Sequence, residues 1–450
     1  MSQSTGGARS GAHSGPLSGP VSGAHLDELE TRDPAAREAA LMAALPAQVA
    51  AAQAVPALAG KLAGIEARAV NSRAALQRLP VTRKGELLER QQAGRAANAS
   101  PWDPFGGFSA IGWRAMSHAG TVRRAATRVY QSPGPIYEPE GAGRDYWRTA
   151  RALFAAGFRA GDLVHNSFSY HLTPGAWMMD NGAQAIGCTV FPGGVGNTEL
   201  QLQAMAELRA DAYAGTPSFL RILLEKATET GVALPSLKKA LVSGEAFPPS
   251  LRDWLRERGV EGYQAYATAD VGNIAYETAA REGLVVDEGV IVEIVRPGTG
   301  DVVAEGEVGE VVVTVLSLDY PLVRFGTGDL SAVLAGRCPT GRTNQRIKGW
   351  MGRADQTAKV RGMFVHPSQI AEVLKRHPEL GRARLVVEGE MANDRMTLRV
   401  ETAEPASAGL GAAVAGTVRD VTKLRCDVEL VAPGSLPNDG KVIEDARKYT

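Results

Sequence analysis

The sequence lacks several features that would point to particular classes of protein. It carries no surplus of charge, because 49 basic residues balance 49 acidic ones. It therefore has no positive field of the kind that nucleic-acid binding needs, and we expect no nucleic-acid partner. It also has no uninterrupted apolar run of roughly 18 residues or more, so we expect no helix that spans a membrane.

Cysteine is scarce as well. The three cysteines, Cys188, Cys338 and Cys426, are far apart and lack the spacing of a zinc site, which excludes a disulfide framework and a zinc cage. Reduced thiols favour a cytoplasmic location. Residues 1–25 are rich in Ser and Gly and lack the apolar core of a secretion signal, so we expect a disordered tail. No Ser-His-Asp arrangement and no paired-carboxylate signature stands out.

What is present indicates an α/β protein of more than one domain. A chain of 450 residues exceeds what one hydrophobic core usually supports. Between residues 121 and 268 apolar strands alternate with amphipathic helices, which predicts a mainly parallel sheet. A β-rich subdomain follows. We place a large amino-terminal domain at 26–351 and a small, mobile α+β domain at 352–450, with the linker at 349–355.

The densest chemistry lies in the segment from Tyr320 to Gly362. There an apolar strand breaks at a Gly-Thr-Gly turn and leaves the carboxylate of Asp329 at the strand end, where open α/β sheets hold ligands. That carboxylate suits the hydroxyls of a ribose. Downstream, Arg346, Lys348 and Arg353 supply cations for a phosphate ester. The alternative is a β-turn aspartate with solvated basic neighbours.

The segments RFGTGDL, GWMGRADQTAKVRGMFVHPSQ and LPNDGK resemble the adenylate-forming (AMP-dependent) synthetase superfamily, and most closely its phenylacetate-CoA ligase branch. The similarity runs from about Leu79 to the end. It implies a large α/β domain closed by a small carboxyl-terminal lid. It also implies that Asp329 and Arg353 bind the nucleotide and that Arg346 contacts its phosphate or ribose.

The resemblance assigns further residues to the nucleotide. The stretch Tyr266-Ala-Thr-Ala-Asp270 implies that Tyr266 stacks on adenine, that Thr268 supplies a hydroxyl and that Asp270 binds Mg²⁺. The segment from Gln131 to Glu140 occupies the slot of the family's phosphate loop, but it has two inner prolines without amide hydrogens and no lysine. Either other groups hold the phosphate or this loop has lost part of its role.

The acid is expected at two segments. Gly244 and Glu245, in the turn Ser-Gly-Glu-Ala-Phe, are assigned to cofactor binding beside the acyl group. Four apolar or aromatic residues are assigned to the pocket of the acid, which suits an aryl or medium-size organic acid. They are Tyr170, His171, Leu172 and Trp177. Core packing is the alternative for Leu172 and Trp177, and a structural histidine for His171.

The small domain carries the remaining predicted residues. Lys441, in the turn Pro-Asn-Asp-Gly-Lys, resembles the catalytic lysine of the family, and we expect it to stabilise charge on the α-phosphate. Asp355, Lys359 and Gly362 are assigned to the hinge or to the face that receives coenzyme A. Surface β-turns and a solvated terminal lysine are the alternatives.

The resemblance therefore implies an ATP-dependent ligase. A carboxylic acid, of which an aryl acid such as phenylacetate is the expected example, attacks Mg·ATP to form an acyl adenylate, and coenzyme A then displaces AMP. One alternative is transfer to a carrier-protein thiol or an amine. Another is a catalytically weakened protein that binds a nucleotide or an acyl adenylate. The expected cofactors are ATP, Mg²⁺ and coenzyme A, and a homodimer is left open.

Overall fold

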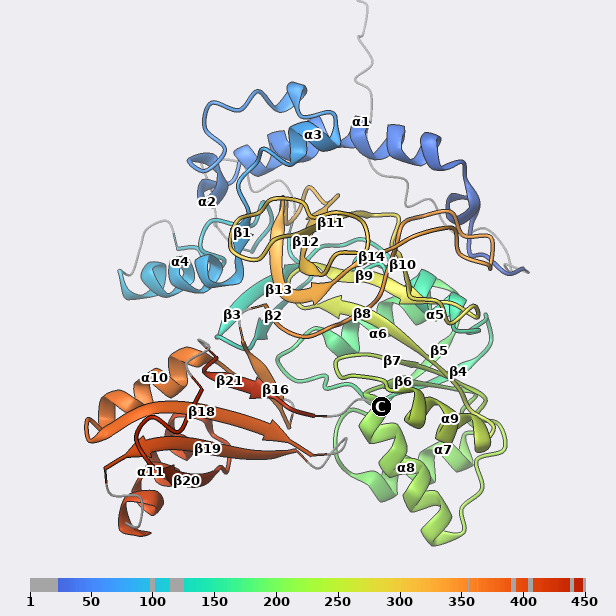
Figure 1. The fold of residues 1–450 in the computed structure, drawn as a ribbon. Coiled ribbons are helices and arrows are strands. Elements are labelled where there is room, and N and C mark those ends of the chain that lie inside the picture. The colour runs from blue at the N-terminus through green and yellow to red at the C-terminus, as the bar shows by residue number, and fades with distance from the viewer. Residues whose placement is uncertain are drawn as a thin grey trace, which may run out of the picture.

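The computed structural model describes residues 23–97, 102–113, 125–354, 356–361, 363–389, 394–403, 408–437 and 441–447. These residues form a large mixed α/β body, and the carboxyl-terminal elements lie beside it as a smaller lobe (Figure 1). The predicted fold class, a large α/β domain with a small α+β domain, is confirmed. Of the predicted tail, residues 1–22 lie outside the described part of the chain.

Helices cover the body at its amino-terminal end. Helix α1 (Pro34–Gln53) begins where the sequence predicts, because the Asp33 side chain accepts hydrogen bonds from amides of the first turn and Pro34 needs no acceptor there. Its buried apolar side chains join the main core of the body. The neighbouring elements are η1 (Glu28–Thr31), α2 (Pro56–Ala59), η2 (Ala67–Ala69), α3 (Arg73–Leu76), β1 (Thr82–Arg83) and α4 (Lys84–Ala96).

The largest sheet has nine strands in the order β14-β15-β10-β9-β8-β7-β6-β4-β5. Neighbours from β8 to β5 are parallel, as the alternating pattern predicts, and those from β8 to β14 are antiparallel. Its strands are β4 (Leu163–Asn166), β5 (Thr189–Pro192), β6 (Ala212–Gly215), β7 (Lys239–Val242), β8 (Glu261–Thr268), β9 (Gly272–Glu277), β10 (Leu284–Val286), β14 (Val333–Leu334) and β15 (Arg346–Ile347). The helices of this part are α5 (Ala150–Ala155), α6 (Gly175–Ala185), α7 (Thr198–Glu207), α8 (Pro217–Thr230) and α9 (Pro249–Glu257).

One predicted strand stays out of the parallel sheet. Strand β2 (Arg128–Ser132) pairs antiparallel with β3 (Ile136–Glu140) in a hairpin of its own. Residues 131–132 and 136–140 of the segment predicted as a phosphate loop therefore lie in strands. The side chains at every second position of β3 are buried, which stabilises an extended conformation over a loop.

The β-rich part forms a second sheet of four strands in the order β1-β13-β12-β11. Strands β11 (Val290–Val295) and β12 (Gly309–Val315) pair antiparallel, as predicted. Strand β13 (Phe325–Ser331) runs through the Gly-Thr-Gly-Asp segment, which corrects the expectation that the strand ends there. A register shift between β12 and β13 absorbs the extra residues, so Asp329 projects from an irregularity inside a strand.

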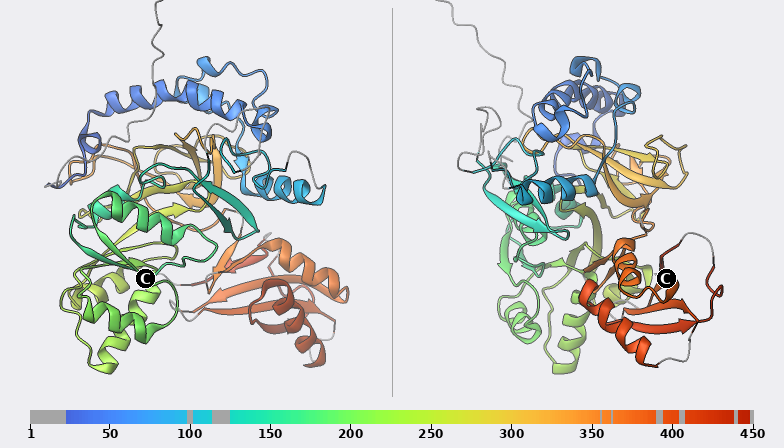
Figure 2. Two further views of the ribbon diagram at one scale, coloured as in Figure 1. Left: turned by 180° about the vertical axis from the view of Figure 1, so that it is seen from behind. Right: turned by 90° about the vertical axis from the view of Figure 1, so that its left-hand side faces the viewer.

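The carboxyl-terminal lobe has a core of its own. Figure 2 shows it to one side of the body. It contains a strand pair, a four-stranded sheet of order β20-β19-β18-β21, and two helices, which matches the predicted α+β composition. The elements are β16 (Ala358–Val360), β17 (Met363–Val365), α10 (Pro367–Arg376), β18 (Leu380–Glu388), β19 (Arg395–Thr402), α11 (Ala408–Thr422), β20 (Asp427–Val431) and β21 (Ile443–Asp445).

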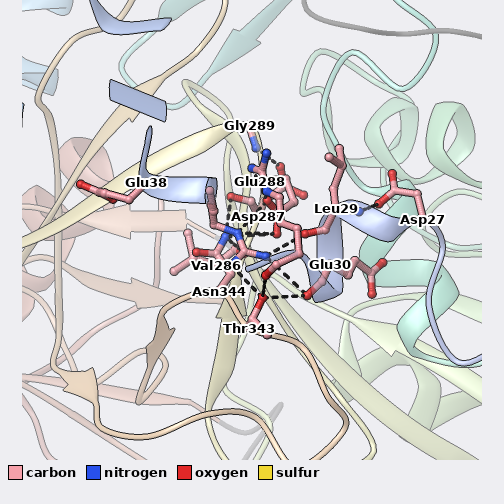
Figure 3. A network of polar contacts seen from close by, with 12 residues as sticks. Asp27, Leu29, Glu30, Glu38, Val286, Asp287, Glu288, Gly289, Thr343 and Asn344 are labelled. Atoms are coloured by element: carbon pink, nitrogen blue, oxygen red, sulfur yellow. Dashed lines mark hydrogen bonds and ion pairs between the residues drawn. The ribbon is translucent and has the colours of Figure 1, made fainter. Parts of the chain in front are cut away.

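Buried ion pairs hold the amino-terminal segment to the β-rich part. Figure 3 shows the polar contacts around Glu288 and Thr343. The Nε atom of Arg37 lies 3.0 Å from Oε2 of Glu288, and the two side chains are only 4% and 5% exposed. Arg32 contacts the same carboxylate at 2.8 Å, and Arg342 pairs with Glu30 at 2.6 Å. Among the described residues, no helix is both long and apolar enough to cross a bilayer.

Candidate active site

A cleft of about 1850 Å³ lies between the body and the carboxyl-terminal lobe. Residues at the ends of β7 and β8, on β13 and at the start of α4 line it from the body. Strands β16 and β21 line it from the lobe. Tyr266, Asp270, Asp329, Arg353 and Lys441, which lie far apart in the sequence, all border this one cleft.

Asp329 is the centre of a hydrogen-bonded group in the cleft. The hydroxyl of Tyr266 donates to its Oδ2 at 2.8 Å, and Arg353 Nη1 and Trp350 Nε1 approach its Oδ1 at 2.9 Å and 3.2 Å. Burial, reinforced by the Asp329 charge, holds the pKa of Tyr266 well above its ordinary value. Tyr266 therefore remains a donor, and it holds the carboxylate in place at the cleft.

Asp270 forms a second charged group with two residues that the sequence did not single out. Lys84, the first residue of α4, places Nζ 3.0 Å from Asp270 Oδ2. Glu138 of β3 is buried nearby and accepts a hydrogen bond from Ser132 Oγ at 2.5 Å. Burial and the Asp270 charge raise the pKa of Glu138 to about 8. Burial opposes the ammonium of Lys84, but the charges of Asp270 and Glu138 outweigh it and raise the pKa of Lys84.

The residues around Asp270 fit a magnesium ion of the kind that the family resemblance implies. Its Oδ1 atom is buried and has no hydrogen-bond partner among the described residues. Mg²⁺ keeps several waters and is usually held by one or two carboxylates together with the phosphates of its nucleotide. The described part of the chain contains no cluster of three or more side chains that makes a complete metal site. Asp270 would thus be the one carboxylate ligand of the ion, beside the phosphates of a nucleotide.

The turn of the β2–β3 hairpin borders the same cleft through Ser132 and Pro133. It has no lysine, as the sequence shows, and Lys84 from another element brings an ammonium to this region instead. The sequence contained one indirect signal for Lys84. The loop in the expected position has no lysine, so a cation in this region has to come from another element.

Gly244 and Glu245 follow β7 and line the cleft. Gly244 has φ +81°, a conformation that favours glycine, and it exposes its carbonyl to the cleft. Lys359 of β16 donates a hydrogen bond from Nζ to this carbonyl and so connects the lobe to the body. Thr268 also lines the cleft, where its hydroxyl accepts from the amide of Val271 at 3.3 Å.

Lys441 borders the cleft just before β21. The amide of the next residue, Val442, donates to Gln356 Oε1 at 2.7 Å. On the other side of β21, Arg447 donates from Nη1 to the carbonyl of Lys359 at 2.8 Å. The lobe therefore presents Lys359 and Lys441 to one cleft from neighbouring strands. Asp355 and Gly362, which the sequence assigned to the hinge, lie outside the described residues.

The structure does not bring Arg346 to the cleft. Its strand, β15, pairs with β10 and β14, and its guanidinium donates to the Glu282 carbonyl at 3.1 Å and to the Ala335 carbonyl at 2.9 Å. It lines a separate hollow together with Glu282 and Lys348. The expected phosphate contact of Arg346 is corrected here, because bonds to its own sheet occupy the side chain. Arg353 and Lys348, the other two predicted phosphate cations, do line the cleft, and so does Lys84.

The four residues predicted for the acid pocket do not line the cleft either. Leu172 is 69% exposed and His171 is also exposed. The hydroxyl of Tyr170 donates to Asp180 at 3.1 Å, and Trp177 packs edge to face against Tyr170 under the guanidinium of Arg128. Hydrogen bonding and packing therefore account for Tyr170 and Trp177, whereas Leu172 and His171 lie at the surface.

Phe168 of the same segment approaches Gly244 instead. A methyl group built on Gly244 would lie 3.8 Å from Cε1 of the Phe168 ring. Phe247 and Trp254 add aromatic surface to the cleft. Sequence reasoning missed Phe168 because the chain is irregular between β4 and α6, so no periodic pattern predicts which of its side chains approaches Gly244.

Comparison with known proteins agrees with this architecture. Residues 148–316 match the family described as AMP-binding enzyme, and residues 362–446 match the AMP-binding enzyme C-terminal domain. The chain is 31% identical over 363 residues to a phenylacetate-coenzyme A ligase of Thermus thermophilus, covering 76% of each chain. It is 26% identical to a crystal structure of 2-hydroxyisobutyryl-CoA ligase with 2-HIB-AMP and CoA in the thioesterification state, with TM-score 0.76, covering 94% of this chain and 92% of that one.

The arrangement of the lobe also bears on that comparison. The same ligase in the postadenylation state, in complex with R3-HIB-AMP, matches with a TM-score of 0.64, again at 26% identity, over 93% of this chain and 91% of that one. The two matches cover nearly the same share of the chain. The present structure is therefore more similar to the thioesterification state than to the postadenylation state.

The α/β body, the carboxyl-terminal lobe and the cleft between them define a two-domain adenylate-forming enzyme. The chain belongs to the AMP-binding enzyme family, in its phenylacetate-CoA ligase-like branch. It is an AMP-forming acid–thiol ligase.

Proposed function

We propose that this ligase activates an aryl acid of the phenylacetate type with Mg·ATP and transfers the acyl group to coenzyme A. The acid carboxylate attacks the α-phosphate of ATP and expels pyrophosphate, which leaves an acyl adenylate. The thiol of coenzyme A then attacks the acyl carbon and AMP departs. The first step needs positioning and charge neutralisation and does not need a protein nucleophile.

The observation that carries this proposal is the meeting of three groups at one cleft. Tyr266 and Asp329 come from the body, Lys84 and Asp270 form an ion pair on the same cleft, and Lys441 lines this cleft from the lobe. The aromatic residues Phe247 and Trp254 in the cleft, with Phe168 at Gly244, suit an aryl acid. The phenylacetate-coenzyme A ligase of Thermus thermophilus supports the same class of acid.

The proposed roles follow from charge and position. Asp329, held by Tyr266 and Arg353, accepts the ribose hydroxyls, and the Tyr266 ring faces the adenine. Asp270 would hold Mg²⁺ through its unpartnered oxygen, and the ion would neutralise charge on the phosphates. Lys84 supplies the cation that the hairpin turn lacks, so the missing loop lysine is no reason to infer a weakened enzyme.

The test is pyrophosphate release with a panel of aryl acids and fatty acids, each with and without coenzyme A. We expect release with aryl acids and thioester formation that depends on coenzyme A. Release with fatty acids alone would contradict the proposed substrate class. Turnover that ignores coenzyme A would indicate a carrier-protein or amine acceptor, and ATP binding without turnover of any acid would indicate a binding protein.

A further inference from the structure

Lys359 reaches across the cleft from the carboxyl-terminal lobe. Its neighbours on β16, Ala358 and Val360, are buried in the core of the lobe. Successive side chains of a strand point to opposite faces, so Lys359 faces away from that core. Its Nζ atom donates a hydrogen bond to the carbonyl of Gly244, on the opposite wall of the cleft. The lobe thus places an amine against the body.

Few side-chain atoms surround the amine of Lys359 where it contacts Gly244. A methyl group built on Gly244 would lie 3.6 Å from Nζ of Lys359 and 3.8 Å from the ring of Phe168. The residue at this point is a glycine with positive φ, which leaves the space open. An amine, a backbone carbonyl and an aromatic ring therefore surround one position. In the proposed function this position lies beside the acyl group.

The charged groups around Lys359 come from three elements. Burial lowers the pKa of Lys359, the carboxylates of Glu245 and Asp329 oppose this, and Arg447 adds to it. Arg447 also donates to the carbonyl of Lys359 at 2.8 Å and so fixes the strand. The net shift is downward, so a larger fraction of the amine is neutral near neutral pH than for a solvated lysine.

The orientation of the lobe determines in which half-reaction the amine of Lys359 reaches Gly244. Lys359 belongs to the lobe, and the structure is more similar to the thioesterification state of 2-hydroxyisobutyryl-CoA ligase, at TM-score 0.76, than to its postadenylation state, at 0.64. Asp329, Tyr266, Asp270 and Lys84 belong to the body. Lys359 reaches Gly244 in the orientation that resembles thioester formation.

We propose that Lys359 is the general base of the second half-reaction, an inference that rests on the proposed function. The neutral amine takes the proton from the thiol of coenzyme A. The sulfur attacks the acyl carbon, a C–S bond forms, and the bond from that carbon to the phosphate oxygen of AMP breaks with its electron pair on AMP. The ammonium then returns its proton to water.

The expected magnitude follows from the thiol itself. A thiol with a pKa near 8.5 is only about 3% thiolate at pH 7. Without a base the step depends on that fraction, so Lys359→Met should slow thioester formation from a supplied acyl adenylate by roughly 30-fold at pH 7. The defect should shrink as pH rises and disappear above about pH 9, because the thiol is then ionised without help. In a single turnover without coenzyme A, pyrophosphate release should match that of the wild-type enzyme.

Two further variants complete the test. Lys359→Arg keeps the positive charge but accepts no proton at these pH values, so it should show the same defect as Lys359→Met. Lys375→Met, which removes an exposed lysine of α10, should change neither half-reaction. A defect that is equal at all pH values, no defect, or full rescue by Lys359→Arg would overturn the inference. If the wild-type enzyme releases no pyrophosphate with any acid, the proposed function fails instead.

Discussion

Lys84→Met is the substitution that most directly tests the charge arrangement of the cleft. Methionine keeps the length of the side chain and removes its charge. The ammonium lies 3.0 Å from Asp270 Oδ2 and acts electrostatically on Glu138. Without it the buried carboxylates of Asp270 and Glu138 lose this cation, which weakens the site for phosphate.

The magnitude follows from the contact that is lost. A hydrogen bond between charged groups contributes about 1.5–3 kcal/mol, and each 1.4 kcal/mol changes a rate by about tenfold. If Lys84 makes one such bond to the ATP phosphates, Lys84→Met should lower kcat/KM for ATP by roughly 10- to 150-fold. Thioester formation from a supplied acyl adenylate should change less, because the triphosphate has then already departed.

The assay is pyrophosphate release at saturating acid with ATP varied. Lys239→Met is the matched control, since Lys239 also forms a partly buried pair, with Asp162 at 2.7 Å, but does not line the cleft. Both variants should lose similar stability in urea unfolding, and only Lys84→Met should lose ATP activation. Wild-type kinetics in Lys84→Met, or an equal kinetic loss in Lys239→Met, would refute the assigned role.

Three further predictions follow from the same contacts. Lys441→Ala should abolish acyl-adenylate formation and spare thioester formation from a supplied adenylate, because the charge on the α-phosphate that Lys441 stabilises develops in the first step. Equal loss of both half-reactions would contradict this role. Glu288→Ala should lower the free energy of unfolding by about 3–5 kcal/mol because it leaves Arg37 buried without its partner, and a loss of less than about 1 kcal/mol in urea unfolding would count against the buried pair. Glu138→Gln should flatten the pH dependence of stability. In the native protein the pKa of Glu138 is about 8, above its ordinary value of 4.5, so the native state holds a proton that the unfolded state has lost. The free energy of unfolding of the wild-type protein therefore falls as the pH rises from 4.5 to about 8, by at most about 1.4 kcal/mol per pH unit. An unchanged slope in Glu138→Gln would contradict that assignment.

Local sequence patterns account for most of the elements and for the family. The Asp33-Pro34 start of α1 and the alternation of strands and helices after residue 160 are local signals, because capping and apolar periodicity act over a few residues. The motifs around Tyr266, Asp270 and Asp329 are similarly local, and these residues do meet at one cleft.

The identity of the cations in the cleft depends on long-range packing. Arg346 and Lys84 are both basic residues near apolar strands. Carbonyls of residues that flank β10 and β14 hold Arg346, whereas the start of α4 places Lys84 at Asp270. The same holds for the aromatic residues, since Phe168 approaches Gly244 and Trp177 packs elsewhere. A motif indicates which chemical groups are available. The direction of a side chain and its neighbours from distant parts of the chain are set only when those parts pack together. In this protein, such packing places Lys84 and Lys359 at the cleft.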